Sequence, residues 1–405
     1  MRHDQFIAGT SAPDWAPVTR RLGLHTLFQV FAEGAAARDT SRTLARDEIQ
    51  ELKRRGFGAL RLHGITLPEL FALARDLASA DPNIAHVFRN HFFAVESHLR
   101  TPGAPFSAKV LKLADAGAMF GVAFSEAAGG PAGSRDQTPG AELVPDGTGF
   151  RVSGTKIYST GNLYADHLFA SARTPDGVTR QFFISTAAEG VGLDDDWDGF
   201  GQRLTGSGKT VFDRVRIEAA DLYDLPKPDP EAPFLYAFTF HQVYLTTVIS
   251  GIVTRILTDA IALVRARGRN FYHALAERPA DEPEIQSVIG RIAAHRAAIL
   301  GVTDRAIAAL DHSWSRAEGP DAHRLSIEAS IAAAEAKVVT DETAATLASL
   351  LIDVASGSGV SHSRALDRHW RNIKVIAAHN PRIYKERVIG DHLLNGALPP
   401  TGAFF

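Results

Sequence analysis

The sequence predicts an α+β fold of three segregated layers: an N-terminal helical part, a central β domain and a C-terminal helical bundle. The spacing of apolar residues changes along the chain from helical, to short β-branched and aromatic runs, and back to helical. Strands and helices do not alternate, which argues against a doubly wound parallel sheet. At roughly 150 residues per domain, 405 residues suffice for two or three packed units. We therefore expect domains at 1–118, 119–225 and 226–405.

The N-terminal part is expected to be helical because apolar residues recur at helical spacing from Arg42 to about Leu113. Thr66 and Glu69 have the spacing of a capping box at the start of one helix. Asp81 followed by Pro82 is typical of an N-cap with proline at the first helical position.

The segment from Met119 to about Tyr223 predicts the β domain, because short strand-like runs are separated by turns such as Asp146-Gly147. A segment with four prolines, Pro226 to Pro233, is predicted to be a linker. Long helical periodicity, rich in alanine, then returns over 234–316 and 326–352 and predicts a helical bundle.

The composition is that of a soluble globular protein, with 45% hydrophobic and 22% charged residues. We expect no membrane span and a cytoplasmic location, since no secretory signal is apparent at the N-terminus. The absence of cysteine excludes disulfides, thiolate metal sites and cysteine nucleophiles. A net charge of -3 with both signs interspersed gives no nucleic-acid footprint, so we expect a small-molecule partner.

A glycine-rich loop follows a strand-like run that contains Ser125 and extends to Ser134. Its small residues would let backbone N–H groups approach an anion such as a pyrophosphate, although most such loops are simply turns. Further on, alternation would place Tyr158 and Thr160 on one face of a strand and Ser159 on the other. An aromatic ring beside a hydroxyl suits a flat heteroaromatic ligand, and a strand that ends in a polar turn is the plainer alternative.

These two motifs, followed by 201–208 and the run Thr210 to Ile217, resemble in order and spacing the middle domain of the acyl-CoA dehydrogenases. The resemblance implies a helical domain, a β-barrel-like domain and a four-helix bundle, usually assembled as a homotetramer. It also implies a flavin cofactor. In the same way it implies that Ser125 and Ser134 lie near the flavin, that Tyr158 covers the ring and that Thr160 bonds its reactive edge.

The C-terminal part extends this resemblance. The run Arg265 to Phe271 is similar to the segment from which an arginine of the family reaches the flavin phosphate, often of a neighbouring subunit. Arg269 is the candidate and Arg267 the alternative. Ser358 and Gly359 belong to a run similar to the second glycine-rich flavin segment of the family, but its usual glutamine is missing here.

A monooxygenase is preferred to a dehydrogenase because the resemblance implies a carboxylate near the C-terminus that this chain lacks. No acid occurs between Arg368 and Pro381, and the run from Leu366 to Gly396 resembles the dibenzothiophene monooxygenase type of flavin enzyme. That resemblance implies a two-component enzyme. It would receive reduced FMN, or FAD, from a separate NAD(P)H flavin reductase and oxygenate a small organic substrate, for example a sulfur or nitrogen compound.

Two histidines are the candidate catalytic residues. His91 lies on the apolar stripe of the helix that starts after Asp81, and His379 precedes an Asn-Pro helix stop. A satisfied core histidine is the commoner explanation for the first. The resemblance implies instead a histidine beside the flavin that donates a hydrogen bond and relays a proton.

Two other hypotheses stay open at this point. The first is an FAD-containing acyl-CoA dehydrogenase whose base is elsewhere, for example at Glu96 or Glu126. The second is a helical scaffold that has kept the fold and lost its flavin.

Overall fold

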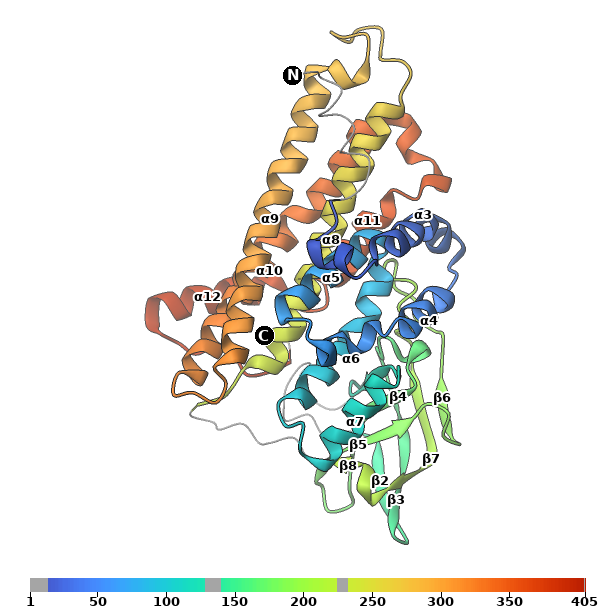
Figure 1. Cartoon of the computed structure of the whole chain (residues 1–405), viewed down its shortest axis with the longest axis vertical. Helices are drawn as coiled ribbons and strands as arrows, with labels where there is room; N and C mark the ends of the chain where they lie inside the picture. Colours follow the sequence, from blue (N-terminus) through green and yellow to red (C-terminus); the bar gives the residue numbers. More distant parts are fainter. Residues whose placement is uncertain (1–13, 128–139, 224–231, 404) are drawn as a thin grey trace.

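The computed structural model describes residues 14–127, 140–223, 232–403 and 405. Its N-terminal part is helical, as predicted (Figure 1). These helices are α2 (Pro17–Arg21), α3 (His25–Ser41), α4 (Arg46–Arg54), the 3₁₀ helix η1 (Phe57–His63), α5 (Leu67–Ala80), α6 (Pro82–Leu99) and α7 (Pro105–Asp115). The helical part starts earlier than predicted, because α3 already buries Phe28, Phe31 and Ala35 at helical spacing.

Both predicted helix starts are confirmed. The Thr66 hydroxyl accepts a hydrogen bond from the Glu69 N–H at 3.3 Å, and the Glu69 carboxylate accepts one from the Thr66 N–H at 2.9 Å, which is a capping box. The Asp81 carboxylate accepts the Asn83 N–H at 3.0 Å, with Pro82 at the first position of α6.

The central part is a mixed sheet whose strand order is β6-β7-β3-β2-β4-β5-β8, with β1 paired in parallel to β4. The strands are β1 (Phe120–Ala123), β2 (Glu142–Asp146), β3 (Gly149–Lys156), β4 (His167–Arg173), β5 (Thr179–Ser185), β6 (Val191–Leu193), β7 (Thr210–Glu218) and β8 (Leu222–Tyr223). The register of β3 against β7 shifts between Val152 and Gly154. Short 3₁₀ turns are η2 (Asn162–Tyr164) and η3 (Ala219–Asp221).

The C-terminal part is a bundle of long helices followed by two shorter ones. They are α8 (Tyr236–Ala266), η4 (Pro279–Asp281), α9 (Pro283–Ser315), α10 (Ala322–Ala355), η5 (Ser356–Val360), η6 (His362–Arg364), α11 (Asp367–Ala377) and α12 (Arg382–Asn395). Most of the predicted linker, and with it the predicted boundary at 225–226, lies outside the described residues.

Helix α8 is the one helix among the described residues that is long and apolar enough to cross a membrane, which the sequence reading did not anticipate. Its apolar side chains nevertheless pack in a shared core with α5, α6, α9 and α10. The approach to α5 is close: a Cβ at Gly251 would lie 2.4 Å from the Arg75 carbonyl oxygen. Helix α8 is therefore hydrophobic because it is the central core helix of the bundle.

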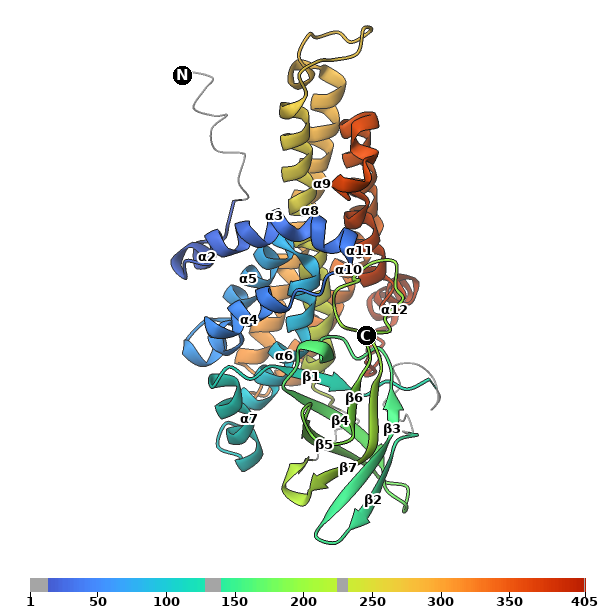
Figure 2. The same cartoon turned by 90° about the vertical axis from the view of Figure 1, so that its right-hand side faces the viewer.

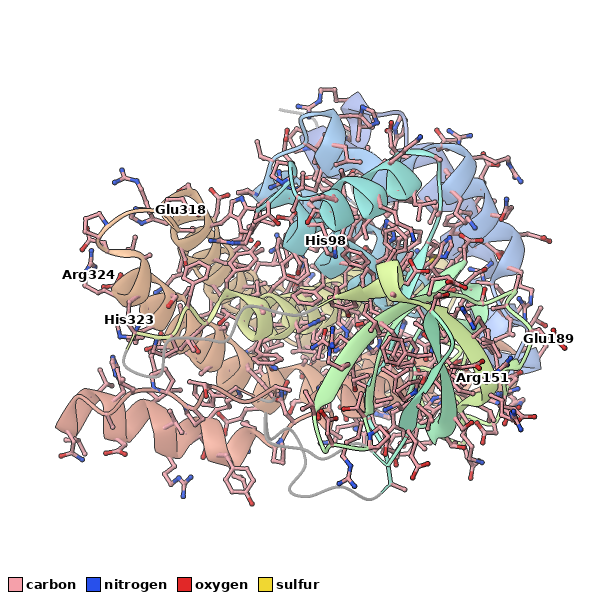
Figure 3. The ribbon with its side chains drawn as sticks, turned by 90° about the horizontal axis from the view of Figure 1, so that it is seen from below. His98, Arg151, Glu189, Glu318, His323 and Arg324 are labelled. Atoms are coloured by element: carbon pink, nitrogen blue, oxygen red, sulfur yellow. The ribbon has the colours of Figure 1, made fainter. Side chains whose placement is uncertain are left out.

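The sheet lies at one end of the molecule, and the loop between α8 and α9 lies at the opposite end of the bundle (Figures 1 and 2). Helices α5 and α6 lie between the sheet and the bundle, so α6 contacts both α8 and β1. Viewed from below, His98 near the end of α6 lies between Arg151 on the sheet and the bundle turn marked by Glu318 and Arg324 (Figure 3).

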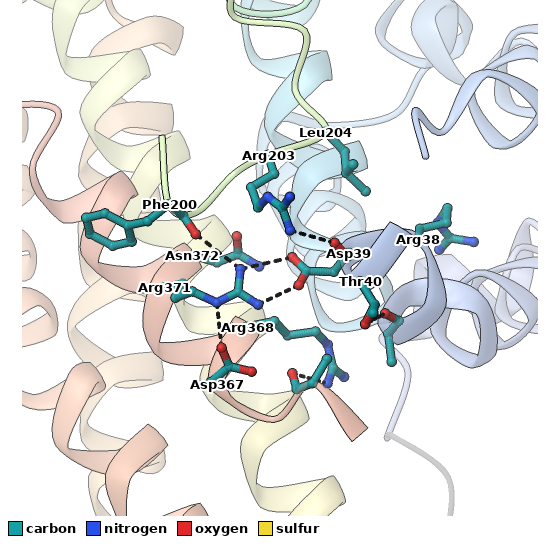
Figure 4. Close-up of polar contacts among 12 residues, drawn as sticks. Arg38, Asp39, Thr40, Phe200, Arg203, Leu204, Asp367, Arg368, Arg371 and Asn372 are labelled. Carbon is teal, nitrogen blue, oxygen red and sulfur yellow. Dashed lines mark hydrogen bonds and ion pairs between the residues drawn. The ribbon is translucent and has the colours of Figure 1, made fainter. Parts of the chain in front are cut away.

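A buried polar network joins α3, α11 and the loop before β7 (Figure 4). The guanidinium of Arg371 donates to both carboxylate oxygens of Asp39, to Asp367 at 2.7 Å and to the Phe200 carbonyl at 3.1 Å. The neighbouring Asn372 accepts the Gln202 N–H at 2.7 Å. The network therefore fixes the position of the 200–205 loop, which forms one side of the site described next.

Candidate active site

Helix α6 carries three polar side chains on one face. His86, Arg89 and Asn90 are spaced i, i+3 and i+4, and all three are buried. The opposite face of the helix packs its apolar residues in the core. Because α6 is covered on all sides by protein, this polar face points into the molecule and not into solvent.

Histidines from two other segments meet this face. The Arg89 Nη1 atom lies 3.3 Å from the Nε2 atom of His379, which follows α11. The ring of His241 on α8 packs against Phe93 at 4.2 Å between centroids. Its pKa is lowered by burial first, and then by the nearby Arg89 and His86. We call His86, Arg89, His241 and His379 the histidine cluster.

The three histidines of the cluster are neutral at neutral pH. Burial, followed by the charge of Arg89, lowers the pKa of His86 to about 3. Burial and the charge of Arg89 hold the pKa values of His241 and His379 well below the usual range. Burial also lowers the pKa of Arg89, to about 10, which still leaves it charged.

The loop before β7 closes the cluster on one side. The Nδ1 atom of His86 lies 2.8 Å from the amide oxygen of Gln202, so this nitrogen carries the proton and Nε2 is an acceptor. Neither His86 Nε2 nor the Gln202 amide nitrogen has a hydrogen-bond partner among the described residues, although both are buried. Buried polar atoms without partners are typical of a site that receives a ligand.

A second group of residues lies beside the cluster. The Thr160 carbonyl accepts from the Asn90 amide at 2.9 Å, and the Thr160 hydroxyl accepts from Ser207 at 2.9 Å. The Ser125 carbonyl accepts the Ile157 N–H at 2.8 Å. The structure thus brings the predicted residues Ser125, Tyr158 and Thr160 into one segment next to α6.

The predicted alternation in this segment is wrong. Strand β3 ends at Lys156, and Tyr158 has a φ of 55°, so the period of two is interrupted. Tyr158 is 65% exposed, whereas Ser159 and Thr160 are both buried. The Tyr158 ring meets Trp197 edge to face at 6.1 Å.

This segment fits a flavin ring. Tyr158 and Trp197 offer aromatic surface, and the buried Ser159 hydroxyl has no hydrogen-bond partner among the described residues. An aromatic surface next to unsatisfied polar atoms is what an isoalloxazine ring, apolar on its faces and polar at its edge, requires. Ser134, the other residue predicted for this site, lies outside the described residues.

The remaining predicted cofactor residues lie at the opposite end of the bundle. Arg269 is exposed in the loop after α8, and Gly359 is buried in η5 against Ala355. Arg267 donates to the Val354 carbonyl at 3.2 Å, so it links this loop to the end of α10. Of the two candidate arginines, Arg269 is thus the one that faces solvent. Within one chain, the loop between α8 and α9, which contains Arg269, lies at the end of the bundle opposite to the sheet (Figure 1). The segment η5, which contains Ser358 and Gly359, directly follows the end of α10 that this loop contacts.

The structure assigns His91 a structural role, so its predicted catalytic role is corrected. Its Nε2 atom lies 3.0 Å from the Gly58 carbonyl, and its Nδ1 atom accepts the Phe120 N–H at 3.2 Å. The ring is 1% exposed and stacks on Phe120 at 5.2 Å. Because the backbone uses both ring nitrogens, neither is left for a substrate or a cofactor.

The sequence reading missed His86, Arg89, Gln202 and His241. A signal was present for the first two, since they and Asn90 form a polar stripe at helical spacing in a helix that starts with a strong cap. That stripe would ordinarily indicate a solvated face. For His241 and Gln202 no local pattern distinguishes them from core or loop residues.

The burial of His91 predicts acid-sensitive stability. Burial lowers its pKa to about 4, against the hydrogen bond to Gly58. Between pH 6.5 and 4 the unfolded chain therefore binds a proton that the folded chain does not, and each pH unit downward costs about 1.4 kcal/mol. We expect His91→Gln to reduce the pH dependence of the free energy of unfolding by about this slope, measured by urea denaturation from pH 4.5 to 7.5.

The matched control is Phe92→Leu, which removes packing from the same helix without removing a titrating group. It should lower the free energy of unfolding by a similar amount at every pH. A His91→Gln protein with the same pH slope as wild type would contradict the prediction.

The family model described as "Acyl-CoA dehydrogenase, C-terminal domain" matches residues 244–381. Among curated proteins, the chain is similar to a probable FMNH2-dependent monooxygenase SfnC of Pseudomonas putida, at 24% identity over 91% of this chain and 93% of that protein. It is also similar to a dibenzothiophene monooxygenase of Mycolicibacterium goodii, at 25% identity over 90% of this chain and 91% of that protein.

Among solved structures, the methanesulfinate monooxygenase MsuC of Pseudomonas fluorescens has a similar fold, and the similarity extends over almost all of this chain. The TM-score is 0.83 at 25% identity, with 96% of this chain and 100% of that chain covered.

Proposed function

Because this chain is a member of the acyl-CoA dehydrogenase superfamily, in its flavin-dependent monooxygenase branch, we propose that it oxygenates a small organic sulfur compound with reduced FMN and O2. The relatives confirm the predicted fold class and the predicted class of enzyme. The observation that carries the proposal is the cluster of three neutral histidines and an arginine beside the Tyr158–Thr160 segment.

The overall reaction balances as substrate plus O2 plus FMNH2 giving oxygenated substrate, FMN and water. When bound, reduced flavin supplies the two electrons that allow O2 to give one oxygen atom to the substrate and the other to water. We propose that Ser125, Tyr158 and Thr160 hold the flavin ring, with Tyr158 covering a face. The side chains of the histidine cluster would then surround the reacting groups.

His379 is the residue best placed for proton transfer. Arg89 carries only N–H donors, so the His379 Nε2 atom accepts and its ring proton is on Nδ1. A neutral imidazole in this tautomer can donate its Nδ1 proton to a developing oxyanion. His86, whose Nε2 atom is an acceptor, can accept a hydrogen bond from a group bound at this cluster.

The dehydrogenase alternative lacks a base. Glu96 is buried in an ion pair with Arg61, and Glu126 is paired with Lys156 and accepts the backbone N–H groups of Gly140 and Ala141. Each of these carboxylates is therefore engaged by a cation within the fold. The ion pairs of Glu96 and Glu126 in the described part of the chain are with Arg61 and Lys156, and neither pair includes a residue of the histidine cluster.

We further propose that the flavin site is completed by a neighbouring subunit of a homotetramer. The loop between α8 and α9 lies at the end of the bundle opposite to the sheet, and in it Arg269, Phe271 and Tyr272 are exposed. An exposed arginine on an apolar loop is suited to reach a phosphate across an interface. A separate NAD(P)H flavin reductase would supply the reduced flavin, and both would act in the cytoplasm.

The proposal is tested by mixing the protein, loaded anaerobically with FMNH2, with oxygenated buffer and following flavin absorbance. We expect flavin oxidation in the presence of protein to be slower than that of free FMNH2. In the presence of methanesulfinate or dibenzothiophene and ¹⁸O2, one labelled oxygen should appear in the product. Oxidation at the free-flavin rate, or bleaching of bound oxidised flavin by an acyl-CoA under anaerobic conditions, would contradict the proposal.

A further inference from the structure

Arg89 is a buried cation without an acidic partner. Its side chain is 6% exposed, and its one hydrogen bond among the described residues is to the neutral ring of His379. Its Nε atom has no hydrogen-bond partner there. The only nearby titratable group that favours its charge is Tyr244, whose pKa is itself raised by burial so that it stays neutral.

Four other buried or largely buried arginines among the described residues have a carboxylate within ion-pair distance. These pairs are Arg38 with Asp81, Arg61 with Glu96, Arg368 with Asp259 and Arg371 with Asp39. An isolated charge is costly to bury, so an arginine that lacks a carboxylate in such a position is suited to receive an anion from outside the protein.

A second donor lies beside the histidine cluster. The amide nitrogen of Gln202 is buried and has no partner among the described residues, while the amide oxygen is used by His86. The backbone of Gln202 is held by Asn372, so its side chain is presented from a fixed loop. A guanidinium and an amide N–H group are a common donor set for an oxyanion.

Building on the proposed function, we propose that the substrate carries an oxyanion group, such as a sulfinate, and that Arg89 binds this group with Gln202. Arg89 faces His379 in the turn between α11 and α12, whereas the adjacent Asn90 bonds the Thr160 carbonyl of the flavin segment. The guanidinium is therefore on the substrate side of the site. A neutral substrate would leave it buried and uncompensated.

Binding can be measured without flavin, which separates this proposal from the oxygenation reaction. The probes are methanesulfinate and benzenesulfinate, and their neutral counterparts are dimethyl sulfone and methyl phenyl sulfone. By isothermal titration calorimetry we expect wild-type protein to bind at least one sulfinate about tenfold or more tightly than its sulfone. Arg89→Met should weaken that binding by about 10- to 100-fold, and Arg89→Lys by less.

The stability of the free protein provides a second readout. Since Arg89→Met removes an uncompensated buried charge, its unfolding midpoint without ligand should equal or exceed that of wild type. The matched control is Arg296→Met, which removes a half-buried arginine that bonds Thr254 on α8, outside the cluster. This control should bind the sulfinates like wild type.

Three results would overturn the proposal: no sulfinate preferred over its sulfone, unchanged sulfinate binding by Arg89→Met, or a lower unfolding midpoint for that variant. A loss of preference for reduced over oxidised FMN in Arg89→Met, with sulfinate binding retained, would assign Arg89 to the charge of the flavin and also contradict it. Sulfinate binding that is intact in a protein unable to oxygenate would contradict the proposed function alone.

Discussion

Replacing His379 with glutamine is expected to lower the rate of substrate oxygenation by about 10²- to 10⁴-fold, the usual contribution of a positioned proton donor. The amide oxygen of glutamine can still accept from Arg89, so the geometry of the cluster should be kept. Glutamine cannot exchange a proton near neutral pH. The two electrons of FMNH2 should then reduce O2 to hydrogen peroxide, and no oxygen atom is transferred to the substrate.

The measurement is the amount of oxygenated product and of hydrogen peroxide formed per FMNH2 consumed. FMN affinity, measured in parallel, should change little. The matched control is His98→Gln, a histidine near the end of α6 whose Nδ1 atom bonds the Ser107 hydroxyl and no residue of the cluster. Product yield near wild type in the His379→Gln enzyme would remove His379 from the catalytic residues.

The second large effect is expected on stability. Arg371→Met should lower the free energy of unfolding by about 3–5 kcal/mol, because it leaves the Asp39 carboxylate buried without its cation. The same substitution frees the 200–205 loop from its contact to the Phe200 carbonyl (Figure 4). Urea denaturation at pH 7 gives the change directly.

The control for this variant is Arg42→Met. Arg42 forms a two-bonded ion pair with Asp195, but both side chains are about one-third exposed, so the loss should be about 1 kcal/mol or less. Combining Arg371→Met with Asp39→Asn should recover part of the loss, since both charges are then absent. Equal effects of Arg371→Met and Arg42→Met would show that the buried network contributes little.

The predictable part of the fold consists of features with local causes. The capping box at Thr66 and the cap at Asp81 follow from side chains within three residues of the groups they bond. The apolar stripe of α6 also placed His91 correctly in the interior. The structural role of His91 could not be predicted from the sequence of α6, because its partners Gly58 and Phe120 belong to other elements.

The site itself depends on contacts that sequence patterns do not encode. His86 meets Gln202 across 116 positions of the chain, and Arg89 meets His379 across 290. A polar stripe on a helix indicates solvent unless the rest of the fold is known to cover it. The family resemblance predicted His379 because that position is tied to a recognisable helix stop, whereas His241 lies in an otherwise apolar helix.

The separation of Arg269 from Tyr158 has a thermodynamic consequence. If two chains each contribute one half of a flavin site, cofactor binding and subunit association share one free-energy cycle, so each strengthens the other by the same factor. Diluting the protein would then lower its apparent affinity for FMN, and adding FMN would favour subunit association. Flavin supply in the cell would thereby set how much of the enzyme is assembled.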